Sequence, residues 1–206
     1  MGIFAHDGKL AQILTTLGNL MVLNILTLLC SIPVITIGPA AVALFNNTIR
    51  IARGEDGPLI SQYFSSFRAN FKQAAILWVL MGGCIAFMAF DIYLLAFLEG
   101  ALGQVYQVVL LVLIILFTLV SIYGFALMAR FDNTMKNTLK NAWILSIGKP
   151  LPAIVFLLFM FLLVGLLAIS YRFIPVLFLL GISGPAYLSS MYFTSLFQKF
   201  ENQSAR

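Results

Sequence analysis

Apolar residues are gathered along this chain into long runs, and the polar residues lie in short segments between them. A helix needs about 20 apolar residues to cross the hydrocarbon core of a bilayer. The runs that meet this requirement without interruption lie near 74–98, 105–130, 151–170 and 173–197. The pattern therefore predicts an all-α fold, a polytopic transmembrane helical bundle that forms a single domain over residues 1–206.

The run from Leu10 to Ile49 is also uncharged, but it is about twice as long as one crossing. It contains Pro33, Gly38 and Pro39. Proline lacks the backbone N–H that a helix uses, and it disfavours helical geometry at the residue before it. We therefore expect a hairpin here rather than one long helix.

The expected hairpin has two spans, near 10–31 and 33–53, with a turn at 31–33. Residues 34–36 should be extended, and the helix should restart with Pro39 at its first helical position, where the missing N–H is not needed. Because the returning helix is short at about 1.5 Å per residue, the extended piece is expected at membrane depth, buried against protein.

A second copy of this pattern lies near the C-terminus. Ile-Pro-Val and Gly-Pro-Ala at 32–34 and 38–40 are echoed by the same tripeptides at 174–176 and 184–186. Such tripeptides also recur by chance in membrane proteins. If the copies are related, they form two broken hairpins that meet in the bundle, as in transporters built from internal repeats. The predicted structural breaks are Pro33, Gly38, Pro39, Pro175, Gly184 and Pro185.

The segments between the spans include two amphipathic stretches, near 58–73 and 131–147. Each has apolar residues at helical spacing, which are Ile60, Phe64, Phe67 and Phe71 in the first, and Phe131, Met135, Leu139 and Trp143 in the second. Aromatic and basic residues together are typical of helices that lie in the inner membrane interface. The second stretch also carries Asn133, Asn137 and Asn141, which are candidates for docking a partner.

Positive charge orients the spans. Of the 12 Lys and Arg residues, all but Arg172 fall on one side when the first run is a hairpin. Cytoplasmic loops are rich in Lys and Arg, so six spans with both termini in the cytoplasm are predicted. A single first pass with an external N-terminus misplaces only Lys9, so five spans stay open.

Composition supports lipid as the main solvent, because 62% of the residues are hydrophobic and 9% are charged. The net charge of +5 comes from residues at the ends of spans, not from a basic patch that would bind nucleic acid. The sole histidine is His6, near the N-terminus, and no Cys-x-x-Cys or phosphate-binding glycine loop is present. We expect no catalytic residues, cofactor or metal site, and no enzymatic activity.

Asp91 is the one carboxylate inside an apolar run. Ionisable residues at membrane depth are costly and are therefore functional candidates. Asp91 also lies toward the outer end of its predicted span, where it can simply reach the headgroup region. Both interpretations stay open.

The segment from Leu23 to Ala74 resembles the YesL family of bacterial integral membrane proteins. The matching pieces are Asn24, the Pro-Val-Ile-Thr-Ile-Gly-Pro-Ala core at 33–40, Arg-Gly-Glu-Asp-Gly at 53–57 and the phenylalanine-rich Phe64–Lys72. That family has no established activity, and its genes commonly lie beside carbohydrate importers of the ATP-binding cassette (ABC) class. The resemblance implies the bacterial cytoplasmic membrane as the location.

Two functions are therefore expected. The first is a non-enzymatic accessory membrane protein linked to carbohydrate uptake, which contacts the permease or ATPase subunits of an ABC importer as well as the lipid bilayer. The alternative is a self-contained small-solute permease or channel that works as an oligomer. In it, the two broken hairpins would form the solute site, and Asp91 would couple transport to protons.

Overall fold

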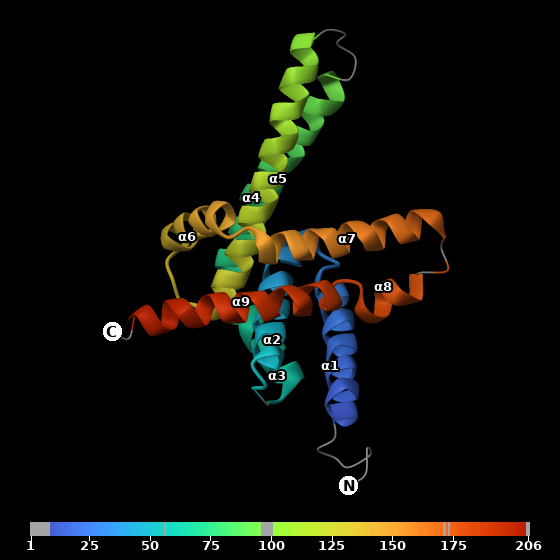
Figure 1. The fold of residues 1–206 in the computed structure, drawn as a ribbon, viewed down its shortest axis with the longest axis vertical. Coiled ribbons are helices and arrows are strands. Elements are labelled where there is room, and N and C mark those ends of the chain that lie inside the picture. Colours follow the sequence, from blue (N-terminus) through green and yellow to red (C-terminus); the bar gives the residue numbers. More distant parts are fainter. Residues whose placement is uncertain (1–8, 56, 96–100, 171, 173, 205–206) are drawn as a thin grey trace.

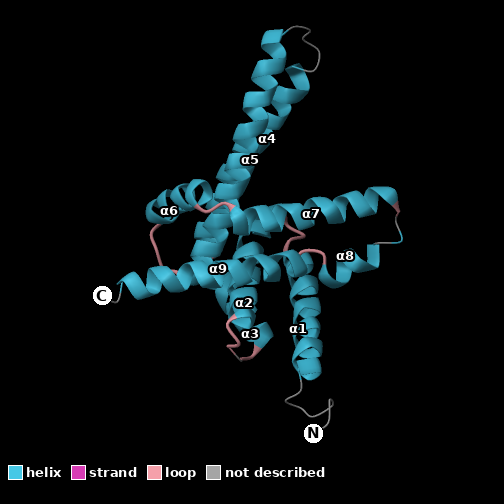
Figure 2. Ribbon diagram, viewed as in Figure 1, coloured by secondary structure: helices cyan, strands magenta, loops and turns pink. Residues whose placement is uncertain are grey.

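The computed structural model describes residues 9–55, 57–95, 101–170, 172 and 174–204. These residues form helices that are joined by turns and short loops, with no strand among them (Figures 1 and 2). The elements are α1 (Lys9–Cys30), the 3-10 helix η1 (Val34–Thr36), α2 (Ile37–Ala52), α3 (Leu59–Ala69), α4 (Phe71–Leu95), α5 (Ala101–Arg130), α6 (Met135–Gly148), α7 (Leu151–Ile169), α8 (Ile174–Leu180) and α9 (Ser183–Ser204).

Five helices in the described residues are long and apolar enough to cross a membrane: α1, η1 with α2, α4, α5 and α7. The pair α8 and α9 counts as a sixth if the two helices, bent by 43°, form one span. The all-α polytopic fold class is thereby confirmed, and the two span numbers expected from the sequence are the two that the helices allow.

The first hairpin turns where the sequence predicted, since α1 ends at Cys30 and Ser31–Pro33 form the turn. The prediction for residues 34–36 was wrong, because they form η1 instead of an extended segment. The hydroxyl of Thr36 donates to the carbonyl oxygens of Cys30 and Pro33, both at 2.6 Å, and this closes the tight helical turn. Val34–Ala52 therefore runs as one helical segment of 19 residues.

The two Gly-Pro-Ala copies occupy the same helical register. Pro39 is the third residue of α2 and Pro185 is the third residue of α9. Neither is at the first helical position that was predicted, but the first four N–H groups of a helix lack partners, so a proline fits there equally well. The Ile-Pro-Val copies differ, since Pro33 lies in a turn and Pro175 lies in the first turn of α8.

The core of the molecule is built around α2, which packs against α9, α5, α4 and α1. The Phe193 ring of α9 lies 5.9 Å from that of Phe45 in α2 and 5.2 Å from that of Tyr123 in α5, both edge to face. Residues 121–129 of α5 are buried without a break. The two broken segments thus meet in the bundle, as the repeat predicted.

The remaining apolar surface faces outward. The α4–α5 hairpin projects from the centre in one direction, whereas α7 and α8 extend in another (Figure 1). Large apolar side chains are exposed along both, among them Phe87, Val108 and Phe161. In water this surface would be unfavourable, and it is the surface that lipid would cover.

Candidate functional site: a polar cluster at the end of α2

Polar residues follow one side of α2 toward its end, although the rest of the helix is apolar. Asn46 and Asn47 are followed by Arg50 and Arg53, at the spacing that keeps side chains on one face of a helix. Glu55 comes directly after the helix. We call these five residues the α2 polar cluster.

Gly54 determines how α2 ends. Its φ of +68° lies in the left-handed region, which favours glycine. The N–H of Gly54 donates to the carbonyl of Ile51, and the N–H of Glu55 donates to the carbonyl of Arg50, both at 3.0 Å. This pair of bonds is a Schellman motif, and it turns the chain back over the helix end.

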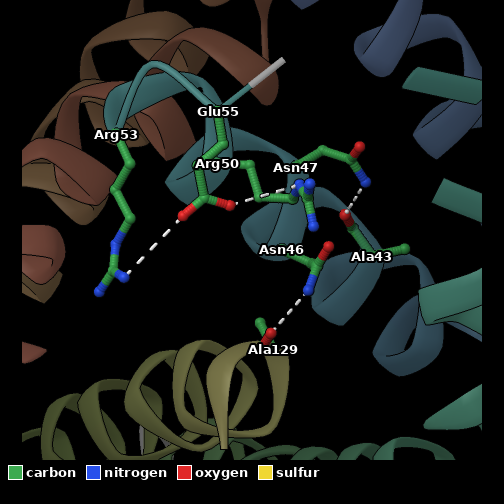
Figure 3. Close-up of polar contacts among 7 residues, drawn as sticks. All are labelled: Ala43, Asn46, Asn47, Arg50, Arg53, Glu55 and Ala129. Carbon is green, nitrogen blue, oxygen red and sulfur yellow. Dashed lines mark hydrogen bonds and ion pairs between the residues drawn. The ribbon is translucent and has the colours of Figure 1, made fainter. Parts of the chain in front are cut away.

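The turn brings the Glu55 carboxylate between two arginines (Figure 3). Its Oε2 lies 3.7 Å from Nε of Arg50, and its Oε1 lies 4.0 Å from Nη1 of Arg53. Both distances are ion pairs but are too long for hydrogen bonds. The guanidinium groups also lie at a helix C-terminus, where the macrodipole favours positive charge.

The two asparagines make different contacts (Figure 3). The amide of Asn46 donates to the carbonyl of Ala129 in α5 at 2.7 Å. The amide of Asn47 donates to the carbonyl of Ala43 at 2.9 Å. The Oδ1 atom of Asn47 and the Nε atom of Arg50 are buried, and neither makes a hydrogen bond with the described residues. Buried polar atoms without partners are uncommon in folded proteins.

Two polar pockets adjoin the cluster. One, of about 830 Å³, lies between the start of α1, the end of α2 and α3, and its lining includes Gln12, Asn47 and Arg50. The other, of about 420 Å³, lies between α2, α3 and the end of α5. Arg50 and Gln62 line both. The arrangement can therefore offer a guanidinium and several amides to a small polar group.

Tyr63 connects α3 to α1 beside this site. Its side chain is fully buried, and its hydroxyl donates to Oγ1 of Thr27 at 3.3 Å. Burial raises the pKa of Tyr63, an effect that the hydrogen bond to Thr27 opposes only in part. The phenol is therefore neutral at ordinary pH and acts as a structural donor.

A second polar contact closes the break between α8 and α9. The amide of Asn24 in α1 donates to the carbonyls of Leu177 and Phe178, both at 2.8 Å. Its Oδ1 accepts from the N–H groups of Ile182 and Ser183, at 2.8 and 3.1 Å. One side chain thus satisfies two carbonyls and two N–H groups at the break, where α8 ends and α9 begins.

The residues singled out from the sequence do not come together. Asp91 is half-buried on α4, four residues before the helix ends at Leu95. Asn137 and Asn141 are exposed on α6. The predicted stripe of three asparagines was wrong for Asn133, because the chain is not helical before Met135 and Asn133 lies in the preceding loop.

The apolar stripe of the second amphipathic stretch packs inward. Phe131, Met135, Leu139 and Trp143 all contact the hydrophobic core, and Trp143 meets Phe117 of α5 edge to face at 5.6 Å. In α3, by contrast, the side that packs inward carries Tyr63 and Ser66, whereas Ile60, Phe64 and Phe71 stay exposed. The α3 stripe therefore remains free to meet lipid.

Sequence reasoning missed the α2 polar cluster, since Glu55 looked like part of a solvated turn. The available signal was two asparagines and two arginines at intervals of three and four residues in an apolar helix. His6 and Asp56 lie outside the described residues.

The fold and its polar contacts define a multi-pass helical protein of the membrane class, with a polar cluster where α1 begins and α2 ends. A family model described as "Protein of unknown function, DUF624" matches residues 20–92. The matched segment includes Asn24, the α2 polar cluster and Asp91, and it ends before α6. No curated protein and no solved structure matches the chain.

Proposed function

We propose that this chain is a YesL-like, non-enzymatic accessory protein of the bacterial cytoplasmic membrane, linked to carbohydrate uptake by an ABC importer. In this proposal both termini are cytoplasmic, and the protein contacts a permease or ATPase subunit of the importer. The family resemblance supports the link to carbohydrate uptake. The architecture of α6 supports the accessory role.

The observation that carries the proposal is how α6 uses its two sides. An interfacial anchor would turn its apolar side to lipid. Here the apolar stripe Phe131, Met135, Leu139 and Trp143 is used for packing on the protein's own core. The residues that stay exposed along the first part of α6 are Lys136, Asn137, Lys140 and Asn141. Amides and ammonium groups held on a rigid helix are suited to hydrogen bonds with another protein.

The test is co-purification from membranes in mild detergent. Replacing Asn137 and Asn141 by alanine raises helix propensity and leaves the packed side intact, so the protein should fold and insert normally. Importer subunits that accompany the wild type should be lost from the double variant. Asn133→Ala, in the loop before α6, is the matched control and should retain them. Equal recovery of every associated protein from all three would exclude this face.

The alternative is a small-solute permease, and the polar pocket of about 830 Å³ is the observation that favours it. That pocket lies at the end of α2 rather than at the broken hairpins, where a permease of the expected kind would bind its solute. At the α8–α9 break, Asn24 already occupies the backbone groups that a solute would use. Uptake of labelled sugars by the purified protein in liposomes would support the permease over the accessory role.

A further inference from the structure

The polar pocket beside the α2 polar cluster continues into an apolar groove. The groove has a volume of about 640 Å³ and lies between α1 and the α8–α9 pair. Its walls include Ile13, Leu17 and Leu180. Gln12, Thr16 and Tyr187 line both the groove and the polar pocket, so the two spaces meet along α1.

A polar chamber joined to an apolar groove matches an amphiphile in both parts. In the chamber, Arg50 presents a guanidinium whose buried Nε donates no hydrogen bond to a described residue. Its ion pair with Glu55 is long, at 3.7 Å. Guanidinium groups bind phosphate strongly because several N–H donors face several oxygens at once. The chamber can therefore bind a phosphate through Arg50.

The same chamber also needs a donor from its ligand. Asn47 is 1% exposed, and its Oδ1 accepts no hydrogen bond from the described residues. A phosphate oxygen cannot satisfy an acceptor, whereas a hydroxyl next to the phosphate can. The headgroup that fits is thus an anionic phosphate that carries hydroxyl groups, and the groove accommodates an acyl chain.

We propose that the joined cavity binds one anionic glycerophospholipid, with its phosphate on Arg50, a headgroup hydroxyl on Asn47 and an acyl chain between α1 and α8–α9. Phosphatidylglycerol has this chemistry. A water-soluble glycerol phosphate has the headgroup but lacks the chain, and it would leave the groove unused.

The experiment uses the full-length protein in a phosphate-free detergent and two lipids with identical acyl chains, phosphatidylglycerol and phosphatidylcholine. Native mass spectrometry measures which lipid is retained, and the thermal midpoint measures stabilisation as lipid is added. Phosphatidylglycerol should be retained in preference and should raise the midpoint more. Equal retention of the two lipids would overturn the proposal, as would equal stabilisation by glycerol 3-phosphate.

Two variants and a control locate the site. Arg50→Gln should weaken phosphatidylglycerol binding by roughly tenfold or more, because a charge-assisted hydrogen bond is lost. Arg68→Gln removes an exposed arginine of α3 that does not line either space, and binding should be unchanged. Equal losses in these two variants would mean that the arginines act only through general surface charge, and would overturn the proposal.

Gly184→Leu tests the groove independently of Arg50. A Cβ at Gly184 would lie 3.8 Å from Cβ of Leu180, which is ordinary contact, so the new side chain can begin without a clash and extend into the groove. This variant should bind phosphatidylglycerol more weakly. Wild-type binding by a folded Gly184→Leu protein would exclude the groove as the place of the acyl chain, even if Arg50→Gln fails to fold.

Discussion

Asn24 and Ser183 lie 159 positions apart in the chain, and the backbone N–H of Ser183 donates a 3.1 Å hydrogen bond to the side-chain oxygen of Asn24. The same side chain bonds three more backbone groups around the α8–α9 break. A bent helix in lipid exposes backbone groups that water cannot reach, so an internal partner is needed. Asn24 is that partner.

Asn24→Ala should therefore destabilise the protein by about 2–4 kcal/mol, at about 0.6–1 kcal/mol for each of the lost bonds. The free energy of unfolding can be measured by denaturant titration in mixed micelles. Asn19→Ala, on the same helix, is the control, because Asn19 is half-buried and takes no part in this contact. Its effect should stay within about 0.5 kcal/mol. Similar losses for both variants would contradict the special role of Asn24.

The two Gly-Pro-Ala glycines should respond differently to alanine. A Cβ at Gly38 would collide with the carbonyl oxygen of Ala74 and would lie 2.8 Å from Cβ of Trp78 in α4. A Cβ at Gly184 meets only Leu180, at 3.8 Å. The sequence pattern treats the two glycines as equivalent, but only Gly38 is at a close approach of two helices.

Gly38→Ala should cost about 1–3 kcal/mol, since α2 and α4 must move apart. Gly184→Ala should be neutral or slightly stabilising, because alanine is the better helix former. Thermal unfolding of both purified variants in the same detergent tests the difference. Equal midpoints would show that the α2–α4 contact can widen at little cost.

Gly54 should be sensitive to backbone conformation alone. No atom lies within 4 Å of the position that a Cβ would take there, but the φ of +68° is unfavourable for other residues. Gly54→Ala should cost about 1–2 kcal/mol. Gly54→Asn should cost less, since asparagine adopts this conformation more readily. An alanine variant as stable as the asparagine variant would contradict the strain argument.

The threading of the chain can be tested with single cysteines in a background that lacks Cys30 and Cys84. Cysteines at Leu102 and Arg172 should react with an impermeant thiol reagent from outside intact cells. Cysteines at Ser65 and Asn137 should react only after the membrane is opened. All four side chains are exposed from the protein, so burial does not confuse the result.

A cysteine at Gln12 decides between six and five spans. Gln12 and Arg50 line the same pocket, so the start of α1 and the end of α2 lie at the same end of the molecule. The cysteine should therefore be protected from outside, as at Ser65. External labelling at Gln12 would contradict the α1–α2 hairpin and leave a single first pass.

Sequence periodicity was enough to locate the helices and the turn at 31–33, because these depend on local features such as apolar run length and proline position. It did not predict that η1 would be helical, which depends on two hydrogen bonds from Thr36. Contacts between distant segments, such as Asn24 with α8 and α9, leave no periodic trace. The α2 polar cluster had a visible spacing, but its geometry depends on how Gly54 turns the chain.

The closure of the α8–α9 break by Asn24 has a consequence for biosynthesis. Asn24 emerges from the ribosome early and is 0% exposed in the finished molecule, whereas its partners at 177–183 emerge late. Until then its amide has no partner from that region, and a lone amide is costly in lipid. A chain whose synthesis stops before α8 would keep this polar group unsatisfied. The cell's membrane proteases would then encounter incomplete chains in a form that the complete protein does not present.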